Sequence, residues 1–321
     1  MISVEDLAFG RIVSPDLDAQ EKFLTDFGMI RVERTKDKLF MRGSDADHHI
    51  HVTELGEPGF MGLAFHARGE EDLDILSSQA EGASPIEEID EPGGGMRVRL
   101  TDPNGLQIEV IWGQKTHEPL EARENIYNMN GEKYARVGDV KRIEAGPSRV
   151  KRSAHCVFIT DKFLETNQWF QDNLGFKTTD VILAPETKDA LAIFNHIDAP
   201  GDDEFVDHHV FLFFQGPKLS FNHLSFEVED FDDVQTGHYH MKAQGYKHAW
   251  GIGRHYLGSQ IFDYWRDPWG RIHEHWTDSD MVNNNHKAQD FPAEEGLQNQ
   301  WGPEFPPDFI EDPSEHAIYG N

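Results

Sequence analysis

The chain has 321 residues, and its 58 Asp and Glu against 29 Lys and Arg give a formal net charge of −29. Such an acidic surface repels phosphate backbones and anionic membranes, which argues against nucleic acid or a membrane as a partner. The single cysteine, Cys156, excludes an internal disulfide and favours a reducing compartment, the cytoplasm. No apolar run approaches the roughly 20 residues that span a bilayer, and the N-terminus does not resemble a secretory signal.

Taken in chain order, each half is predicted to form a strand, an amphipathic helix and several further strands. In the second half, residues 154–160 are rich in strand formers, and the following helix repeats apolar residues at helical spacing until Gly175. Asp161 is expected to cap that helix. The later elements are strands at 208–214, 219–228, 260–265 and 271–276, a helix at 231–244, and a turn at 267–270.

Three segments of the first half recur in the second. The matched pairs are residues 14–28 with 161–175, 59–65 with 220–226, and 101–109 with 266–274. This alignment places His155, His223 and Glu274 opposite Ala8, Gly62 and Glu109. Residues found in both copies belong to the scaffold, so residues found in one copy are the candidates for chemistry.

The repeat predicts an α+β fold of tandem βαβββ modules, with two domains of two modules each. We expect a degenerate, non-catalytic domain at 1–113, a polar connector at 114–151 and a catalytic domain at 152–280. The tail, 281–321, is rich in Asn, Pro, Glu and Gly. It is expected to run along the surface or along a neighbouring subunit.

His155, His223 and Glu274 each fall within a predicted strand of the second half. Two imidazoles and one carboxylate are the ligand set of non-haem Fe(II) oxygenases, which leave adjacent positions open for substrate and O₂. The same ligands suit Mn(II), and geometry alone also allows Zn(II). Because the other copy lacks both histidines, the scaffold does not need them, and we predict a metal site.

The second half resembles the catalytic domain of type I extradiol ring-cleaving dioxygenases, of the vicinal oxygen chelate superfamily. The resemblance rests on Ala154-His-Cys-Val, on Phe221-Asn-His-Leu-Ser-Phe, and on the run from Gly251 to Glu274 with its GxGRH, Tyr and DPxG elements. It implies extradiol cleavage of a substituted catechol by O₂ at Fe(II), with Mn(II) as the alternative ion, in aromatic-compound catabolism. The product would be a ring-opened semialdehyde or keto acid, and the enzyme would be a homo-oligomer.

The resemblance also implies catalytic roles for His208, His255 and Tyr264. His208 would move protons, while His255 and Tyr264 would hydrogen-bond the catecholate. An imidazole titrates near neutral pH and a phenol can donate to a developing oxyanion, so these residue types suit the task. The pair His208-His209 recurs as His48-His49 in the first half, so it is partly a scaffold feature. We select His208 from the family spacing and because Val210 and Leu212 would share its face of a strand.

An alternative is a metal-dependent isomerase or lyase of the glyoxalase or epimerase type, with the metal acting as a Lewis acid. A metal-free binding module is disfavoured, because it would lack the ligands in both copies. Aromatic residues of the second half could line a pocket, although each alone is better explained as core: Phe194, Phe211, Phe213, Trp250, Tyr256 and Phe262. Three further histidines, His238, His240 and His248, are expected to be solvated. The sequence leaves open which catechol is cleaved.

Overall fold

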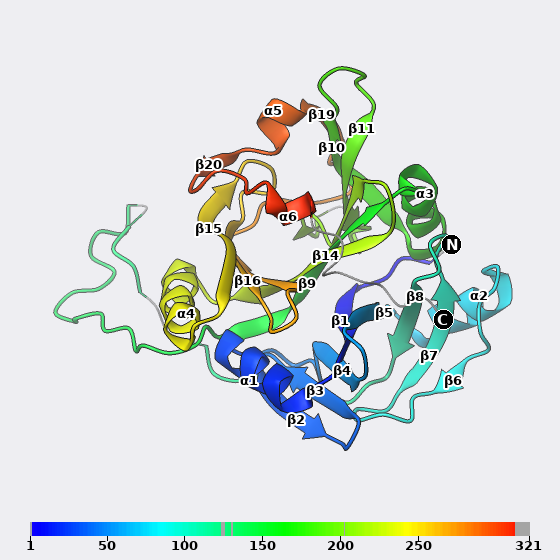
Figure 1. The fold of residues 1–321 in the computed structure, drawn as a ribbon, viewed down its shortest axis with the longest axis horizontal. Coiled ribbons are helices and arrows are strands. Elements are labelled where there is room, and N and C mark those ends of the chain that lie inside the picture. Colours follow the sequence, from blue (N-terminus) through cyan, green and yellow to red (C-terminus); the bar gives the residue numbers. More distant parts are fainter. Residues whose placement is uncertain (1, 123–125, 130, 202, 312–321) are drawn as a thin grey trace.

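A computed structural model describes residues 2–122, 126–129, 131–201 and 203–311 of the protein. The first half contains two helices and eight short or medium strands that form one sheet (Figure 1). Its elements are β1 (Asp6–Ser14), α1 (Leu17–Phe27), β2 (Ile30–Arg34), β3 (Lys38–Arg42), β4 (His51–Leu55), β5 (Gly59–His66), α2 (Glu70–Gln79), β6 (Glu87–Glu88), β7 (Met96–Thr101) and β8 (Gln107–Trp112).

The second half repeats this succession and adds a short strand, β12. Its elements are β9 (Val150–Thr160), α3 (Phe163–Leu174), β10 (Phe176–Leu183), β11 (Ala190–Ile197), β12 (Val206–Asp207), β13 (Phe211–Gln215), β14 (Ser220–Val228), α4 (Phe231–Gln244), β15 (Lys247–His255), β16 (Ile261–Arg266) and β17 (Ile272–Thr277). The tail contributes β18 (Met281–Val282), β19 (Gln289–Pro292), α5 (Ala293–Gly296), β20 (Asn299–Trp301) and α6 (Asp308–Glu311).

The two large sheets have the same topology. The first runs β2-β3-β4-β1-β5-β8-β7-β6, and the second runs β10-β11-β13-β9-β14-β17-β16-β15 with β19 and β20 added at its edges. In each sheet the first strands of the two modules pair antiparallel at the centre, β1 with β5 and β9 with β14. The predicted α+β fold of tandem βαβββ modules is therefore confirmed.

Local sequence explains where the helices begin and end. Asp16 accepts the N–H groups of Asp18 and Ala19 at the start of α1, and Gly28 ends that helix with φ of 117°. The prediction that Asp161 caps α3 is wrong, because the helix begins at Phe163, after Lys162. Helix α3 has 12 residues where α1 has 11, and this difference shifts the alignment of the strands before them by one residue.

The main hydrophobic core extends across both halves, so each sheet has one apolar face buried within the molecule. Phe60 of β5 stacks on Phe221 of β14 with ring centroids 4.4 Å apart, and Leu224 packs where Gly10 has no side chain. Figure 1 shows α1 beside α4 on one side of this junction, with α2 and α3 on the other. The opposite face of each sheet therefore lines a separate interior, away from the shared core.

The Asp-Pro-Trp-Gly turn between β16 and β17 fastens the two halves together. Asp267 binds the guanidinium of Arg271 at 2.6 Å, and Arg271 is 1% exposed. The same guanidinium donates to Ser14 Oγ at 2.7 Å and to the carbonyl of Gly59 at 3.2 Å, both in the first half. The turn therefore joins the two halves, while the strands on either side of it, β16 and β17, carry Tyr264 and Glu274 to the site.

Residues between β8 and β9 form no helix or strand where the structure describes them. The tail continues the second sheet, because β19 pairs with β10 and β20 pairs with β15. Helix α6 brings Phe309 against Tyr264, with ring centroids 4.9 Å apart. Among the described helices, none has the length and apolar character needed to cross a membrane.

Candidate metal centre

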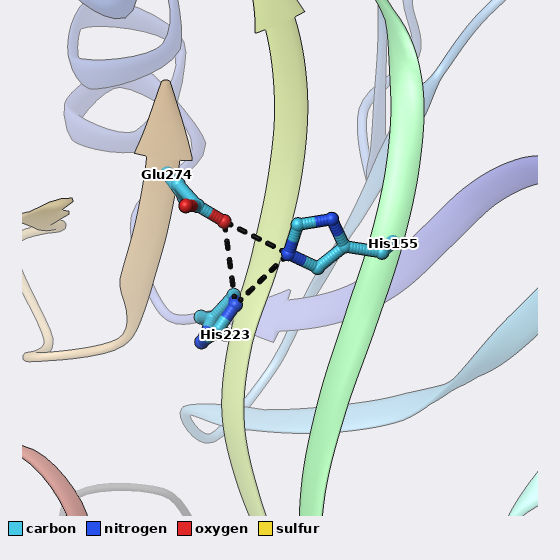
Figure 2. Close-up of side chains that lie close together, drawn as sticks. All are labelled: His155, His223 and Glu274. Carbon is cyan, nitrogen blue, oxygen red and sulfur yellow. Dashed lines mark hydrogen bonds and ion pairs between the residues drawn. The ribbon is translucent and has the colours of Figure 1, made fainter. Parts of the chain in front are cut away.

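Three neighbouring strands of the second sheet carry the predicted ligands. In the pairing of β14 with its two neighbours, Ser225 lies opposite both His155 on β9 and Glu274 on β17. His223 precedes Ser225 by two residues, so the strand alternation places it on the same face. The small Ser225 side chain leaves room between the longer ones, and His155, His223 and Glu274 converge on the inner face (Figure 2).

The ligand atoms lie close enough to share one ion. Nε2 of His155 is 2.9 Å from Oε2 of Glu274, and Nε2 of His223 is 3.4 Å from the same oxygen. The two Nε2 atoms are 3.3 Å apart. A divalent metal bound at about 2.0–2.2 Å from each atom separates its ligands by roughly 3 Å. These distances therefore fit a metal bound by all three side chains.

Burial and hydrogen bonding also favour a cation here. The exposed fractions of His155, His223 and Glu274 are 2%, 4% and 0%. Neither oxygen of Glu274 has a partner with hydrogen-bond geometry among the described residues. Nδ1 of His223 donates to Oδ1 of Asn222 at 2.6 Å, which leaves Nε2 with its lone pair. A buried carboxylate and two imidazole nitrogens therefore converge on one point, an arrangement that could hold a metal ion.

The charges of these groups are suited to the same task. Burial would raise the pKa of Glu274, but its contacts with His155, His223 and His255 lower it well below its ordinary value. Burial lowers the pKa of His223 to about 4, against the opposing effect of Glu274. The carboxylate is therefore ionised and the His223 imidazole neutral near pH 7, as metal ligands must be.

His255 and Tyr264 lie beside the ligands, where the sequence predicted them. Nε2 of His255 is 2.9 Å from the hydroxyl of Tyr264 and 3.8 Å from Oε1 of Glu274. Burial, reinforced by Glu274, raises the pKa of Tyr264 well above its ordinary value. The phenol consequently keeps its proton and can donate it in a hydrogen bond.

The structure corrects the choice between the paired histidines. The ring of His209 lies 4.3 Å from the ring of His155, whereas Nε2 of His208 is 2.8 Å from Oδ2 of Asp180 and turns away from the site. The expected alternation fails because β13 begins only at Phe211, and the residues before it form a bend. Val210 therefore joins the core on the far face instead of sharing a face with Leu212.

Sequence reasoning missed Asp180, which connects to His209 through His208. Nδ1 of His208 is 3.1 Å from Nδ1 of His209. If Asp180 accepts the Nε2–H of His208, then Nδ1 of His208 accepts from Nδ1–H of His209. Nε2 of His209 is then free to accept a proton. The sequence around Asp180 does not indicate this contact, because Asp180 lies 28 residues before His208 in the chain.

A pocket opens onto the ligand side of the sheet. It is lined by His155, Val157, Ile182, Phe194, His209, Leu212, Phe214, Asn222, His223, Trp250, His255, Leu257, Gln260, Tyr264, Gly296, Leu297, Gln298, Phe305 and Phe309. None of these is an acid, a lysine or an arginine. Of the aromatic residues considered from the sequence, Phe194 and Trp250 line the pocket, while Phe211 and Phe213 lie in the core behind the sheet.

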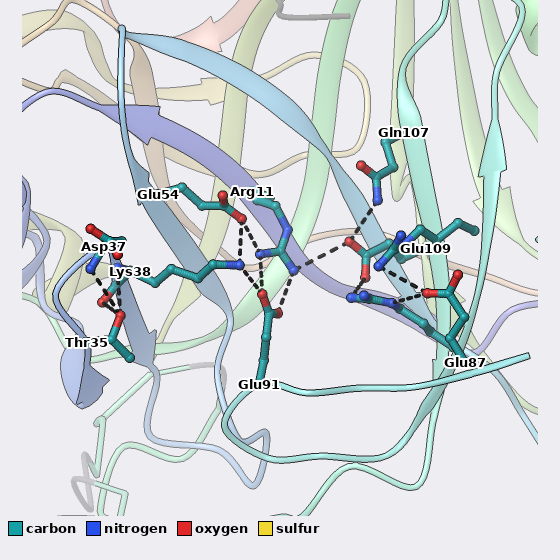
Figure 3. Close-up of polar contacts among 11 residues, drawn as sticks. Arg11, Thr35, Asp37, Lys38, Glu54, Glu87, Glu91, Gln107 and Glu109 are labelled. Carbon is teal, nitrogen blue, oxygen red and sulfur yellow. Dashed lines mark hydrogen bonds and ion pairs between the residues drawn. The ribbon is translucent and has the colours of Figure 1, made fainter. Parts of the chain in front are cut away.

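The corresponding place in the first half holds a salt-bridge network. Strand pairing puts Phe9, not Ala8, opposite His155, because Phe9 pairs with Ala64 as His155 pairs with Ser225. Glu109 occupies the position of Glu274. Its Oε1 lies 3.5 Å from the guanidinium of Arg11, which also binds Glu91 at 2.9 Å (Figure 3). Together with Arg97, which lies 3.0 Å from Oε2 of Glu109, Arg11 neutralises the buried carboxylate of this half.

Comparisons with known proteins agree with this geometry. Residues 152–272 match the model of the Glyoxalase/Bleomycin resistance protein/Dioxygenase superfamily. Metapyrocatechase 2 of Cupriavidus necator is 28% identical over 298 residues, which are 92% of this chain and 88% of the relative. The manganese-dependent 2,3-dihydroxybiphenyl 1,2-dioxygenase of Geobacillus genomosp. 3 is 27% identical over 190 residues, 56% of this chain and 57% of the relative.

Solved structures share the fold over nearly the whole chain. The Mn(II)-bound glyoxalase from Novosphingobium aromaticivorans superposes with a TM-score of 0.81 at 22% identity, covering 100% of this chain and 97% of that one. Homoprotocatechuate 2,3-dioxygenase from Brevibacterium fuscum, in its substrate complex, gives 0.77 at 17% identity, covering 97% and 93%. The chain thus has the vicinal oxygen chelate fold. The predicted resemblance to extradiol dioxygenases is confirmed.

Proposed function

We propose that the protein catalyses extradiol cleavage of a substituted catechol by O₂, with Fe(II) held by His155, His223 and Glu274. The product would be a ring-opened semialdehyde or keto acid. The observation that carries the proposal is the convergence of these three buried ligands at the floor of an apolar pocket. The similarity to two enzymes named as a metapyrocatechase and a dihydroxybiphenyl dioxygenase supports it.

When bound, the metal would supply a positive centre with open positions at which the two substrates can meet. The residues around it would manage protons and orientation. We propose that His209, in place of His208, accepts a proton from a catechol hydroxyl and returns it later, with Asp180 and His208 holding its tautomer. Tyr264 would donate to a substrate oxygen as negative charge develops there, and His255 would orient that phenol.

The pocket indicates the substituent that the catechol carries. Its walls are mainly aliphatic and aromatic side chains, among them Leu212, Phe214 and Leu297, with no lysine or arginine to pair with an anionic group. Burying a carboxylate against such walls would be costly without a partner. We therefore propose an uncharged alkyl or aryl substituent, in a compound of aromatic catabolism.

The metal and the domain roles are part of the same proposal. Fe(II) is favoured by the ligand set, and Mn(II) is the alternative ion because one relative is named as manganese-dependent. Residues 152–280 would form the catalytic domain and 1–113 the non-catalytic one, joined by 114–151 and followed by the tail 281–321. Assembly as a homo-oligomer and a cytoplasmic location stay predictions of the sequence.

The glyoxalase or epimerase alternative is less well supported. One structural neighbour is named a glyoxalase, but at 22% identity that likeness concerns the fold. Ring cleavage is better supported, because all three proposed ligands come from one half and His255 and Tyr264 lie beside them. Assaying the reconstituted protein with a hemithioacetal would separate the two activities.

The test is anaerobic reconstitution with Fe(II), followed by measurement of O₂ uptake with a panel of neutral and carboxylated catechols. We expect stoichiometric O₂ uptake and a yellow ring-opened product, fastest with a neutral substituted catechol. Parallel reconstitution with Mn(II) decides the metal. No uptake with any catechol, together with unchanged metal content in His223→Ala, would refute the proposal.

A further inference from the structure

A second group of metal-ligating side chains lies on the other face of the catalytic sheet. His238 on α4, His248 on β15 and Asp263 on β16 bring one ligand atom each to within 4.8 Å of one another. The expectation that these histidines are solvated is wrong for His238, whose side chain is 16% exposed, whereas His248 is exposed as expected. Asp263 is fully buried.

The distances within this group match those of a bound cation. Nδ1 of His238 lies 3.1 Å from both oxygens of Asp263, and Nε2 of His248 lies 2.7 Å from Oδ1. The two imidazole rings meet edge to face, with centroids 4.9 Å apart. Tetrahedral ligands bound at about 2.0–2.2 Å are separated by roughly 3.3 Å, so small rotations of these rings admit an ion.

No lysine or arginine in the described part of the chain pairs with the carboxylate of Asp263. Among the described residues, its ion pairs are with His238 and His248 alone. The indole N–H of Trp265 donates to Oδ2 at 2.6 Å, which fixes the orientation of the carboxylate and leaves Oδ1 facing the imidazoles. A buried carboxylate needs a compensating positive charge, and a divalent ion would supply it at neutral pH.

The neighbouring backbone leaves room above Asp263. Gly251 lies opposite Asp263 in the β15–β16 pair and has φ of 118°. A Cβ at Gly251 would lie 3.0 Å from Oδ1 of Asp263, so a side chain there would crowd the carboxylate. The partly exposed edges of His238 and His248 give an ion a path from solvent.

We propose that His238, His248 and Asp263 form a second divalent metal site of structural type, suited to Zn(II) with water as the fourth ligand. Imidazole and carboxylate bind Zn(II) more tightly than Mn(II) or Fe(II), in the usual order of divalent metals. Asp263 and Tyr264 are adjacent on β16 and face opposite sides of the sheet. An ion here would tie α4 to the strands that carry His255 and Tyr264, and it does not depend on the proposed reaction.

The test is a Zn(II) titration of the full chain, stripped of metal by a chelator and monitored by competition with a chromophoric indicator. We expect two equivalents bound by the wild type, one by His248→Ala and one by His223→Ala. His240→Ala is the matched control, because His240 is on the same helix, is 20% exposed and binds Asp26 instead. It should still bind two equivalents.

Asp263→Asn tests the same site with little change of shape, since the amide oxygen can still accept from Trp265. We expect it to bind one equivalent and to keep the wild-type circular dichroism spectrum. Zn(II) should also raise the thermal midpoint of His223→Ala but not of the double variant His223→Ala/His248→Ala. Equal stoichiometry in wild type, His248→Ala and Asp263→Asn would overturn the second site while leaving the catalytic site untouched.

Discussion

The two halves of the molecule fill the same interior in different ways. In the second half, His155, His223 and Glu274 meet with no arginine or lysine among the charged partners that the structure describes for Glu274. In the first half, Phe9 and Gly62 replace the histidines, and Arg11 and Arg97 neutralise Glu109. The scaffold therefore keeps a buried carboxylate in both places, balanced by arginines in the first half and by the proposed metal in the second.

The largest expected effect on activity comes from replacing the proposed carboxylate ligand of the second half, compared with replacing its counterpart in the first. Glu274→Gln should lose the bound metal and reduce ring cleavage by more than about 100-fold, because it removes the one charged ligand. Glu109→Gln, the matched control, should retain wild-type metal content and activity. Metal analysis and O₂ uptake measure both. Equal losses in the two variants would contradict the assignment of catalysis to the second half.

The paired histidines provide the next comparison. His209→Ala should lower kcat by about 10²–10⁴-fold through loss of a proton acceptor at the site, with metal content retained. His208→Ala should have a smaller effect, because His208 acts by orienting its neighbour. His49→Ala in the first half should leave kcat unchanged. Steady-state kinetics on metal-loaded protein measure these effects. A greater loss of kcat in His208→Ala than in His209→Ala would identify His208 as the proton acceptor, as the sequence predicted.

The third comparison concerns Arg11, which pairs with Glu109 in the first half where we propose a metal in the second. Arg11→Met should lower the free energy of unfolding by about 1–3 kcal/mol, because it removes a buried partner of Glu109 and Glu91, while Arg97 still pairs with Glu109 and Lys38 with Glu91. The double variant Arg11→Met/Glu109→Gln should recover part of that loss. Denaturant unfolding measures it. A neutral Arg11→Met would show that Arg97 and Lys38 suffice.

The smallest effect is a pH dependence in the first half. Burial, with His48 nearby, lowers the pKa of His49 to about 3 from an ordinary value of 6.5. The unfolded chain therefore binds a proton below pH 6.5 that the folded chain excludes. This group thus stabilises the fold above that pH, and its contribution declines as the pH falls towards 3.

His49→Phe should flatten the decline of unfolding free energy by at most about 1.4 kcal/mol per pH unit. Denaturant unfolding between about pH 5 and 6.5 measures the slope, above the range in which Glu91, with a pKa lowered to about 2, contributes. Equal slopes in variant and wild type would show that the pKa of His49 is the same in the folded and unfolded chain.

The fold and the convergence of His155, His223 and Glu274 could be predicted because the repeat supplies an internal control. A histidine that its structural counterpart lacks is visible without any structure, and strand periodicity places it on a face. The alignment still missed by one residue at Phe9, because α3 is one residue longer than α1 and Gly28 and Gly175 anchored the match. Single-residue register depends on helix length and bulges, which the pattern of apolar residues does not resolve.

The remaining errors arise from contacts between distant segments. His209 faces the ligands because the chain bends before β13, and no residue in that segment predicts the bend. Asp180, Phe305 and Phe309 reach the site from another strand and from the tail. Their roles depend on the tertiary arrangement of the chain, and the sequence of each segment alone contains no sign of them.

The most direct test of the account is anomalous diffraction from crystals of the chain reconstituted anaerobically with Fe(II), recorded across the iron edge. We predict an iron peak about 2.0–2.2 Å from Nε2 of His155, Nε2 of His223 and a carboxylate oxygen of Glu274, and none beside Glu109. An occupied iron site elsewhere with none at these three atoms, or an equal peak beside Glu109, would contradict it.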